Sequence, residues 1–262
     1  MTFAIFALIM ELTNALRKLI SSLNERKHRR SHGLFKAEGT KCIADTIGSF
    51  QLFGLFATPE WAESHYDIIE KADGHVCYVS SRDLTRMSSL TTPQNAIAVY
   101  EIPNYTLNFA SLEGRLSLAL DGIQDPGNLG TIMRTADWFG ISDILCSHST
   151  ADVWNPKVVQ ATMGAISRVR MHYCDLSEIM REVRIPIYGT FLDGENIYGA
   201  NLTVEGIIVM GNEGNGISDE VSKYIGHRLT IPSFSAGNET SESLNVAIAT
   251  AITVSEFRRH LI

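Results

Sequence analysis

The stretch Asp125-Pro-Gly-Asn-Leu-Gly-Thr-Ile-Met-Arg-Thr135 decides the fold of this 262-residue chain, together with Gly211-Asn-Glu-Gly-Asn-Gly-Ile217 and Ser243-Leu-Asn-Val246. Each of the three lies where an apolar, strand-like run meets the start of a helix-like run. In open α/β sheets, ligands bind at the carboxyl ends of the strands, where backbone N–H groups converge. The three stretches can therefore fold back onto one ligand, and they indicate an α/β domain with a single binding site.

The sequence around these stretches alternates between strands and helices. Apolar runs predict strands at 115–120, 144–146, 169–172, 185–192, 206–210 and 229–231. Helices are expected to begin at Asn128, Asn155, Asp175 and Ser218, where a capping residue stands, and a long closing helix is expected at 243–261. Such alternation implies a parallel or mixed sheet that is covered by helices.

The first half of the chain predicts a second, smaller α/β domain. Leucine and isoleucine recur at helical spacing over 11–30, and a further helix is expected at 39–47. Strands are expected at 51–57, 76–79 and 96–100, and Thr58-Pro59 marks a helix start. Residues 102–113 show no periodicity and contain Pro103, which is typical of a linker. We therefore expect two domains, at 10–103 and 112–262.

The composition is that of a globular protein with a buried core. Hydrophobic residues make up 45% of the chain and charged residues 19%, which are ordinary values. The first ten residues are apolar but too short to span a bilayer, they lack the marks of a signal peptide, and Met10 begins a more conventional opening. The cysteines show no CxxC pair, which favours reduced thiols in a cytoplasmic protein over a zinc site or disulfides; they are Cys42, Cys77, Cys146 and Cys174.

The charge is unevenly distributed. The first 105 residues carry 11 basic and 11 acidic side chains, so the net charge of −7 belongs to the rest of the chain. An acidic protein is not the usual binder of nucleic acid, but a local basic run is sufficient. Such a run exists at Arg26, Lys27, Arg29 and Arg30. On charge alone it is either an RNA contact or the solvated end of a helix.

Taken singly, the three loops have ordinary structural interpretations. Asn128 can be a helix cap, Arg134 a surface cation and Ser243 a second cap. The spacing GxxGxG at 211–216 differs from the dinucleotide fingerprint and from the P-loop. A GxSxG elbow and a cluster with metal-ligand spacing are both absent from the sequence, so neither a hydrolase nor a metal site is expected. The residues alone thus indicate a ligand-binding site of uncharged type, in which backbone groups contact the ligand.

Together, the loops resemble a known family. The NxGxxxRT run at Asn128–Thr135, the GxEGxG run at Gly211–Gly216 and the SLNV run at Ser243–Val246 are similar to the three signature motifs of the SpoU (TrmH-type) RNA 2′-O-ribose methyltransferases of the SPOUT superfamily. The resemblance covers about 115–262. Leu34-Phe35-Lys36-Ala37-Glu38-Gly39 resembles the ribosomal-protein-like substrate-binding domain that often precedes it.

The resemblance implies methyl transfer from S-adenosylmethionine to a ribose 2′-hydroxyl of structured RNA, with ribosomal RNA favoured over transfer RNA. It also implies a homodimer, a deep trefoil knot in the C-terminal domain, and no metal. The family places the donor at Thr190, Gly211, Ile231 and Leu244. Around the reacting ribose it uses Asn128, Arg134, Glu213, Ser243 and Asn245.

One alternative of a different class stays open, a non-catalytic RNA-binding or ribosome-assembly protein that retains the knotted dimer. The intact residues Asn128, Arg134, Glu213 and Asn245 argue against it. Which RNA and which nucleotide are recognised depends on the N-terminal domain. The polar loop before Leu244 is longer than the family usually shows.

Overall fold

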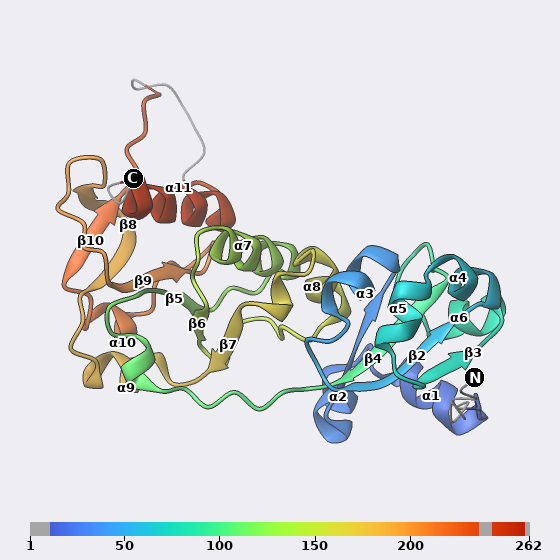
Figure 1. Ribbon diagram of the computed structural model, residues 1–262. Coiled ribbons are helices and arrows are strands. Elements are labelled where there is room, and N and C mark those ends of the chain that lie inside the picture. Colours follow the sequence, from blue (N-terminus) through green and yellow to red (C-terminus); the bar gives the residue numbers. More distant parts are fainter. Residues whose placement is uncertain (1–10, 236–242, 260–262) are drawn as a thin grey trace. The chain divides into compact units, whose positions relative to one another are not determined.

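The computed structural model of the chain describes residues 11–235 and 243–259 (Figure 1). The apolar opening at 1–9 and most of the polar loop before Leu244 lie outside these residues. The described residues form two compact units. The first contains the chain up to Asn104 together with Asp152–Ser167, and the second contains Tyr105–Ala151 together with the chain from Arg168 onward.

The first unit is a four-stranded mixed sheet with short helices around it. Its strand order is β1-β4-β2-β3, in which β2 and β3 are parallel and the other pairs antiparallel. The strands are β1 (Leu34–Glu38), β2 (Leu52–Ala57), β3 (Val76–Tyr78) and β4 (Ala96–Glu101). The helices are α1 (Asn14–Ser22), α2 (Arg26–His32), α3 (Thr40–Thr46), α4 (Pro59–Ser64), α5 (Tyr66–Lys71), α6 (Ser81–Met87), α8 (Pro156–Ala161) and the 3₁₀ turn η2 (Ala165–Ser167).

The single helix expected over 11–30 is wrong, because the chain breaks there into α1 and α2. Leu23 ends α1 with its side chain fully buried, and Glu25 starts α2 in an extended conformation. The break exposes the carbonyl groups of Leu23 and Asn24, and Arg29 Nη1 donates to both at 2.8 Å. A buried cation therefore stabilises a turn that helical periodicity does not reveal.

The second unit is a six-stranded sheet in the order β10-β8-β9-β5-β6-β7, and every pair in it is parallel. The strands are β5 (Leu116–Asp121), β6 (Asp143–Cys146), β7 (Arg170–Tyr173), β8 (Ile187–Asn196), β9 (Gly206–Gly211) and β10 (His227–Thr230). The helices are the 3₁₀ turn η1 (Phe109–Ser111), α7 (Pro126–Trp138), α9 (Leu176–Glu182), α10 (Asp219–Ser222) and α11 (Val246–Arg259). The α/β fold is thus confirmed, and of the two predicted kinds of sheet, parallel or mixed, this unit has the parallel one.

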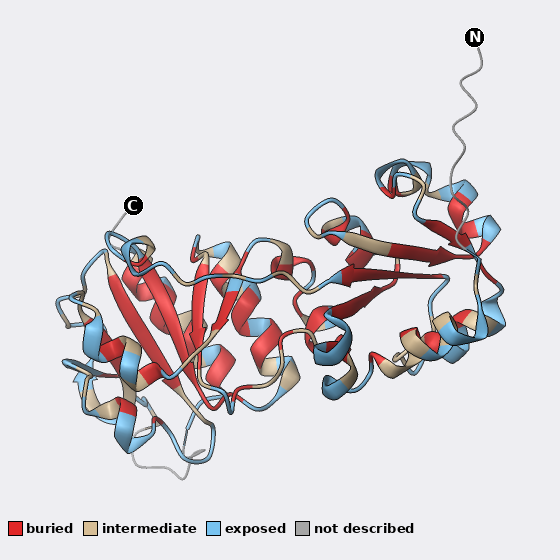
Figure 2. Cartoon of the chain, turned by 90° about the horizontal axis from the view of Figure 1, so that it is seen from below, coloured by how far each residue is buried: buried red, intermediate tan, exposed pale blue. Residues whose placement is uncertain are grey.

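The centre of this sheet forms the core of the second unit. β5 is buried along its whole length and β9 along nearly all of it, as Figure 2 shows by colour. Parallel strands that helices cover on both faces have this continuous apolar character. α7 packs against α11 (Figure 1). The helix that contains most of the first motif and the helix that begins at the end of the third motif therefore lie side by side.

Candidate functional site

The second loop is fixed to the carboxyl end of the neighbouring strand. In the parallel register, Asp121 at the end of β5 lies opposite Gly211 at the end of β9. Asn212 Nδ2 donates to the carbonyl of Gly122 at 2.7 Å, and Asp121 Oδ2 accepts from the N–H of Ser218 at 2.8 Å. Both ends of the loop are therefore tied to β5. Sequence reasoning missed Asp121 and Asn212, although an aspartate just after a predicted strand was a usable signal.

Within the loop, the backbone closes tightly on itself. Asn212 and Gly216 exchange two N–H···O hydrogen bonds of 2.9 Å, and Asn212 Oδ1 accepts from the N–H groups of Gly214 and Asn215. A Cβ on Gly211 would lie 2.3 Å from the carbonyl carbon of Gly216 and 2.4 Å from the nitrogen of Ile217. Only glycine fits at Gly211, because the opposing atoms belong to the backbone and cannot move aside cheaply.

One chain of hydrogen bonds joins all three motifs. Asn245 Nδ2 donates to Asn128 Oδ1 at 2.9 Å, and Asn128 Nδ2 donates to Glu213 Oε1 at 2.6 Å. Asn245 Oδ1 also accepts from the N–H groups of Ala247 and Ile248, so Asn245 caps the start of α11. The structure thereby brings together three of the residues that were expected around the ribose.

The expected cap at Asn128 is wrong. Asp125 caps α7, since its Oδ1 accepts from the N–H of Asn128 at 2.8 Å and Pro126 occupies the first helical position. The side chain of Asn128, one turn later, is therefore free to reach Glu213 and Asn245.

A pocket of about 480 Å³ opens beside this chain of hydrogen bonds. All four residues predicted to hold the donor line it, and so do Glu213 and Ser243; the four are Thr190, Gly211, Ile231 and Leu244. Its wall also includes Phe191 and Asp193, which sequence reasoning did not identify. Arg228 stacks 3.4 Å above the Phe191 ring and donates to Asp193 at 2.7 Å. Arg228 therefore fixes the positions of both side chains in this wall of the pocket.

The charge of the pocket is distinctive. Two carboxylates, Asp193 and Glu213, line it, whereas its described lining includes no lysine or arginine. A phosphate-bearing ligand would face these carboxylates unfavourably, while a ligand with a cationic centre would not. Apolar side chains, among them Ile231 and Leu244, supply surface for a flat ring.

Arg134, Asn128 and Asn245 do not line the pocket. Arg134 is exposed on α7, in a stripe that also contains Thr131 and Trp138. Across the residues that the structure describes, its guanidinium has no hydrogen-bond or ion-pair partner. A helix cation without a structural partner is available for a substrate.

The predicted RNA-contacting residues lie in the first unit, on α2. Arg26, Lys27 and Arg30 are exposed. Arg29 is only 2% exposed, and its Nε and Nη2 bind the Asp152 carboxylate at 3.0 and 2.5 Å while Nη1 binds two carbonyls. Its hydrogen-bonding capacity is therefore used by the fold, so that Arg29, unlike the three exposed residues, is not available to an RNA.

Two further properties hold for residues 11–235 and 243–259. In that part of the chain, groups of three or more His, Cys, Asp or Glu side chains able to hold a metal ion do not occur. Within the same ranges, none of the helices has the length and apolar character needed to cross a membrane.

Comparison with known proteins matches both units. The SpoU rRNA Methylase family matches residues 115–255, and the MRM3-like substrate binding domain matches 14–98. The 23S rRNA (guanosine(2553)-2′-O)-methyltransferase RlmP of Bacillus subtilis is 29% identical over 90% of this chain and 93% of its own length.

Two solved structures are similar over nearly the whole chain. A TrmH-family protein from Porphyromonas gingivalis is 41% identical, with a TM-score of 0.83 over 95% of this chain and 99% of its own. An AdoMet-bound rRNA methyltransferase from Sinorhizobium meliloti is 29% identical, with a TM-score of 0.83 over 97% of this chain and 99% of its own.

The chain belongs to the SpoU rRNA methylase family. The prediction of an RNA 2′-O-ribose methyltransferase is confirmed, and so is S-adenosylmethionine as its methyl donor. The pocket fits this donor, because its carboxylates suit a sulfonium cation, its apolar walls suit a purine ring, and the bare backbone at Gly211 permits close approach.

Proposed function

We propose that this chain methylates a ribose 2′-hydroxyl of ribosomal RNA. Its methyltransferase domain would span 112–262 and its substrate-binding domain 10–103. The observation that carries the proposal is the chain of hydrogen bonds Asn245–Asn128–Glu213, which joins the three motifs beside the donor pocket. The rRNA substrates of its relatives support the choice of RNA.

The residues would act mainly by position. S-adenosylmethionine supplies a methyl group on a sulfonium, and a ribose hydroxyl is a weak nucleophile that must meet it in line. Thr190, Gly211, Ile231 and Leu244 would hold the donor, with Ser243 shaping its loop. Asn128, fixed on both sides, would orient the carboxylate of Glu213 toward the reacting groups. Such positioning supplies a large part of the rate of a displacement reaction.

Arg134 would stabilise the negative charge that develops on the ribose oxygen, or hold the adjacent phosphate. Its guanidinium stays protonated in protein settings, which favours an electrostatic role over that of a general base. Its exposed position without a structural partner supports this role.

A homodimer through the C-terminal domain is part of the proposal. Trp138 on α7 is 85% exposed and Ile248 on the adjoining α11 is 51% exposed. Large apolar side chains on two packed helices are typical of a surface that a second copy covers. Sedimentation of the Trp138→Lys variant tests this, since the variant should be a monomer if the face pairs.

The deep trefoil knot and the cytoplasmic location also remain proposals. The knot is supported by membership of the SpoU family. Four free cysteines and the ribosomal substrate support the cytoplasm.

Transfer of radiolabelled methyl groups from S-adenosylmethionine to ribosomal and transfer RNA tests the function. We expect incorporation into ribosomal RNA only, and the 2′-O-methyl mark lost on deletion of the gene identifies the nucleotide. Donor binding without incorporation into either RNA would instead favour the non-catalytic assembly protein.

A further inference from the structure

A concave groove lies on the first unit between α1 and α6. It has a volume of about 510 Å³. Its lining consists of Asn14, Arg17, Lys18, Ser21 and Ser22 from α1 and Arg86 from α6. Three of these six side chains are cationic and none is acidic. The charge of the groove is thus opposite to that of the donor pocket, whose described lining has two carboxylates and no lysine or arginine.

The cations of the groove differ in how firmly they are held. Arg17 Nη1 pairs with Asp83 Oδ1 at 3.0 Å, and Arg17 also donates to Asn14 Oδ1, so Arg17 is largely engaged within the fold. Lys18 and Arg86 are exposed, and among the described residues neither charged group has a partner. Two free cations therefore remain on opposite walls, one on each helix.

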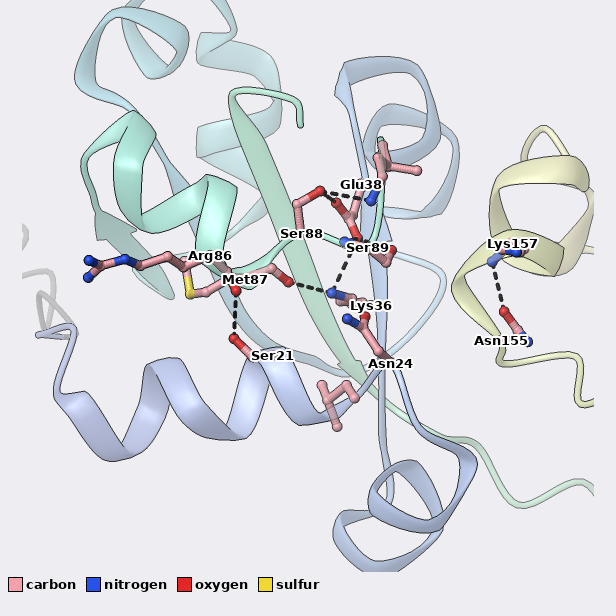
Figure 3. Close-up of polar contacts among 12 residues, drawn as sticks. Ser21, Asn24, Lys36, Glu38, Arg86, Met87, Ser88, Ser89, Asn155 and Lys157 are labelled. Carbon is pink, nitrogen blue, oxygen red and sulfur yellow. Dashed lines mark hydrogen bonds and ion pairs between the residues drawn. The ribbon is translucent and has the colours of Figure 1, made fainter. Parts of the chain in front are cut away.

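The wall that carries Arg86 is rigid, because the last two residues of α6 and the two residues after it are each held by a side chain from another element (Figure 3). Ser21 Oγ donates to the carbonyl of Arg86 at 2.8 Å, and Lys36 Nζ donates to the carbonyl of Met87. The Glu38 carboxylate accepts from the hydroxyl of Ser88 and from the N–H of Ser89 at 2.8 Å.

The support behind these contacts is buried. Lys36 is fully buried and Glu38 is 3% exposed, and the two form an ion pair of 3.3 Å on β1. A buried pair that also saturates neighbouring backbone groups fixes them in one arrangement. The backbone that carries Arg86 is therefore already ordered in the free protein, and binding of a charged ligand does not require it to rearrange.

The distribution of charge along the chain indicates a polymeric anion. Between Asn14 and His32 the sequence has six lysines and arginines against one carboxylate, Glu25. One of the six, Arg29, is buried. The others extend from the groove along α1 and α2, and a single small anion could not reach them all.

We propose that the groove between α1 and α6 binds the phosphodiester backbone of the RNA substrate through Lys18 and Arg86. This contact is separate from the predicted one at Arg26, Lys27 and Arg30 on α2, and it rests on the proposed function. Because the protein as a whole has a net charge of −7, local cationic surfaces of this kind must supply its affinity for RNA.

The test compares Lys18→Ala/Arg86→Ala with a control that removes two exposed cations of the same unit from outside the groove, Lys71→Ala/Arg82→Ala. The probe is a radiolabelled 23S rRNA transcript in filter binding at several salt concentrations, without methyl donor. Loss of two phosphate contacts should lower the log–log salt slope by about 1.4–1.8 and weaken binding roughly tenfold near 0.1 M salt. The control variant should match the wild type.

Neither double variant removes an internal contact, so both should fold as the wild type does. Thermal unfolding checks this. An affinity and a slope equal to those of the control would overturn the proposal and leave the groove to another partner, such as an acidic protein. The outcome is independent of catalysis. A wild type that binds through the groove but transfers no methyl group would retain this inference and reject the proposed function.

Discussion

Asn128 Nδ2 donates a 2.6 Å hydrogen bond to Glu213 Oε1 across 85 residues of sequence. Asn128 Oδ1 at the same time accepts from Asn245 Nδ2, 117 residues away, at 2.9 Å. An amide side chain can donate through its nitrogen and accept through its oxygen at the same time. A carboxylate at 128 would face that of Glu213, and an apolar side chain would leave both partners unbound.

Asn128→Ala should therefore lower the rate of methyl transfer roughly a hundredfold, because the reacting groups lose their alignment. Its melting temperature should change little, since the bonds lie in an exposed setting. In a double-mutant cycle with Asn245→Ala, the two losses should be strongly non-additive. Additive losses, measured as kcat/KM on ribosomal RNA, would show that the two residues act separately.

Gly211→Val should abolish donor binding, and even Gly211→Ala should weaken it roughly tenfold or more, since a Cβ there meets the backbone of Gly216 at 2.3 Å. The clash lies within the loop, so the damage reaches the donor through displacement of 216–217. Gly199→Ala is the matched control, because its Cβ would meet only the carbonyl oxygen of Asn196 at 3.9 Å and Gly199 does not line the pocket. Calorimetry with S-adenosylmethionine compares the variants, and equal affinities in folded Gly211→Ala and Gly199→Ala proteins would refute the assignment.

Arg134→Ala should retain the melting temperature and the donor affinity but lose methyl transfer by roughly a hundredfold to a thousandfold. The residue is exposed and has no partner in the described chain, and alanine is at least as good a helix former. Arg181→Ala, an exposed arginine on α9, serves as the control. A variant at 134 that unfolds, or one that stays fully active, would exclude this role.

The resemblance to the SpoU family, rather than any strand pattern, predicted the four donor residues that line the pocket, Thr190, Gly211, Ile231 and Leu244. The structure shows how the first two segments meet, because the parallel register brings the carboxyl ends of neighbouring strands together. The opposite wall escaped prediction. The stacking of Arg228 on Phe191 depends on the pairing of β8 with β10, whose register shifts between Arg228 and Leu229. Periodicity in one segment cannot specify such a shift.

The ion pair between Arg29 and Asp152 shows what a local sequence pattern cannot predict. A basic run looks uniform in sequence, yet one of its members is buried against a carboxylate 123 residues later. Asp152 belongs to the segment Asp152–Ser167, which the contacts assign to the first unit although it stands between β6 and β7. Trp154 anchors this segment, with its ring 4.5 Å from that of Phe35. Such long-range burial carries no local signal.

Asp143 should make the fold sensitive to acid. Burial raises the pKa of its carboxyl, but hydrogen bonds from His172, Arg170 and Ser142 outweigh burial and hold the pKa well below its ordinary value of 3.8. A depressed pKa in the folded state gives stability that is complete above the unfolded-state pKa and is lost as the pH falls toward the folded-state pKa. The wild type should therefore lose stability below about pH 4.

Asp143→Asn should lower the free energy of unfolding at pH 7 by about 2 kcal/mol and flatten its decline in acid. Asp137→Asn is the comparison, because the Asp137–Arg168 pair is partly exposed and should contribute less than about 1 kcal/mol. Urea unfolding at pH 3–7 measures both variants. An acid profile for Asp143→Asn as steep as that of the wild type would contradict this prediction.

The basic run on α2 should divide into two classes of residue. Arg26, Lys27 and Arg30 are exposed, so the triple alanine variant should keep its melting temperature and its donor affinity. It should weaken binding to a 23S rRNA transcript and lower the log–log salt slope by about 2.1–2.7.

Arg29→Ala should instead destabilise the fold by about 3 kcal/mol, because Asp152 and two carbonyls lose their partner. Where the protein stays folded, the salt slope of Arg29→Ala should equal that of the wild type. If the triple variant binds the transcript with unchanged affinity and slope, α2 is only a solvated helix and the RNA is held elsewhere.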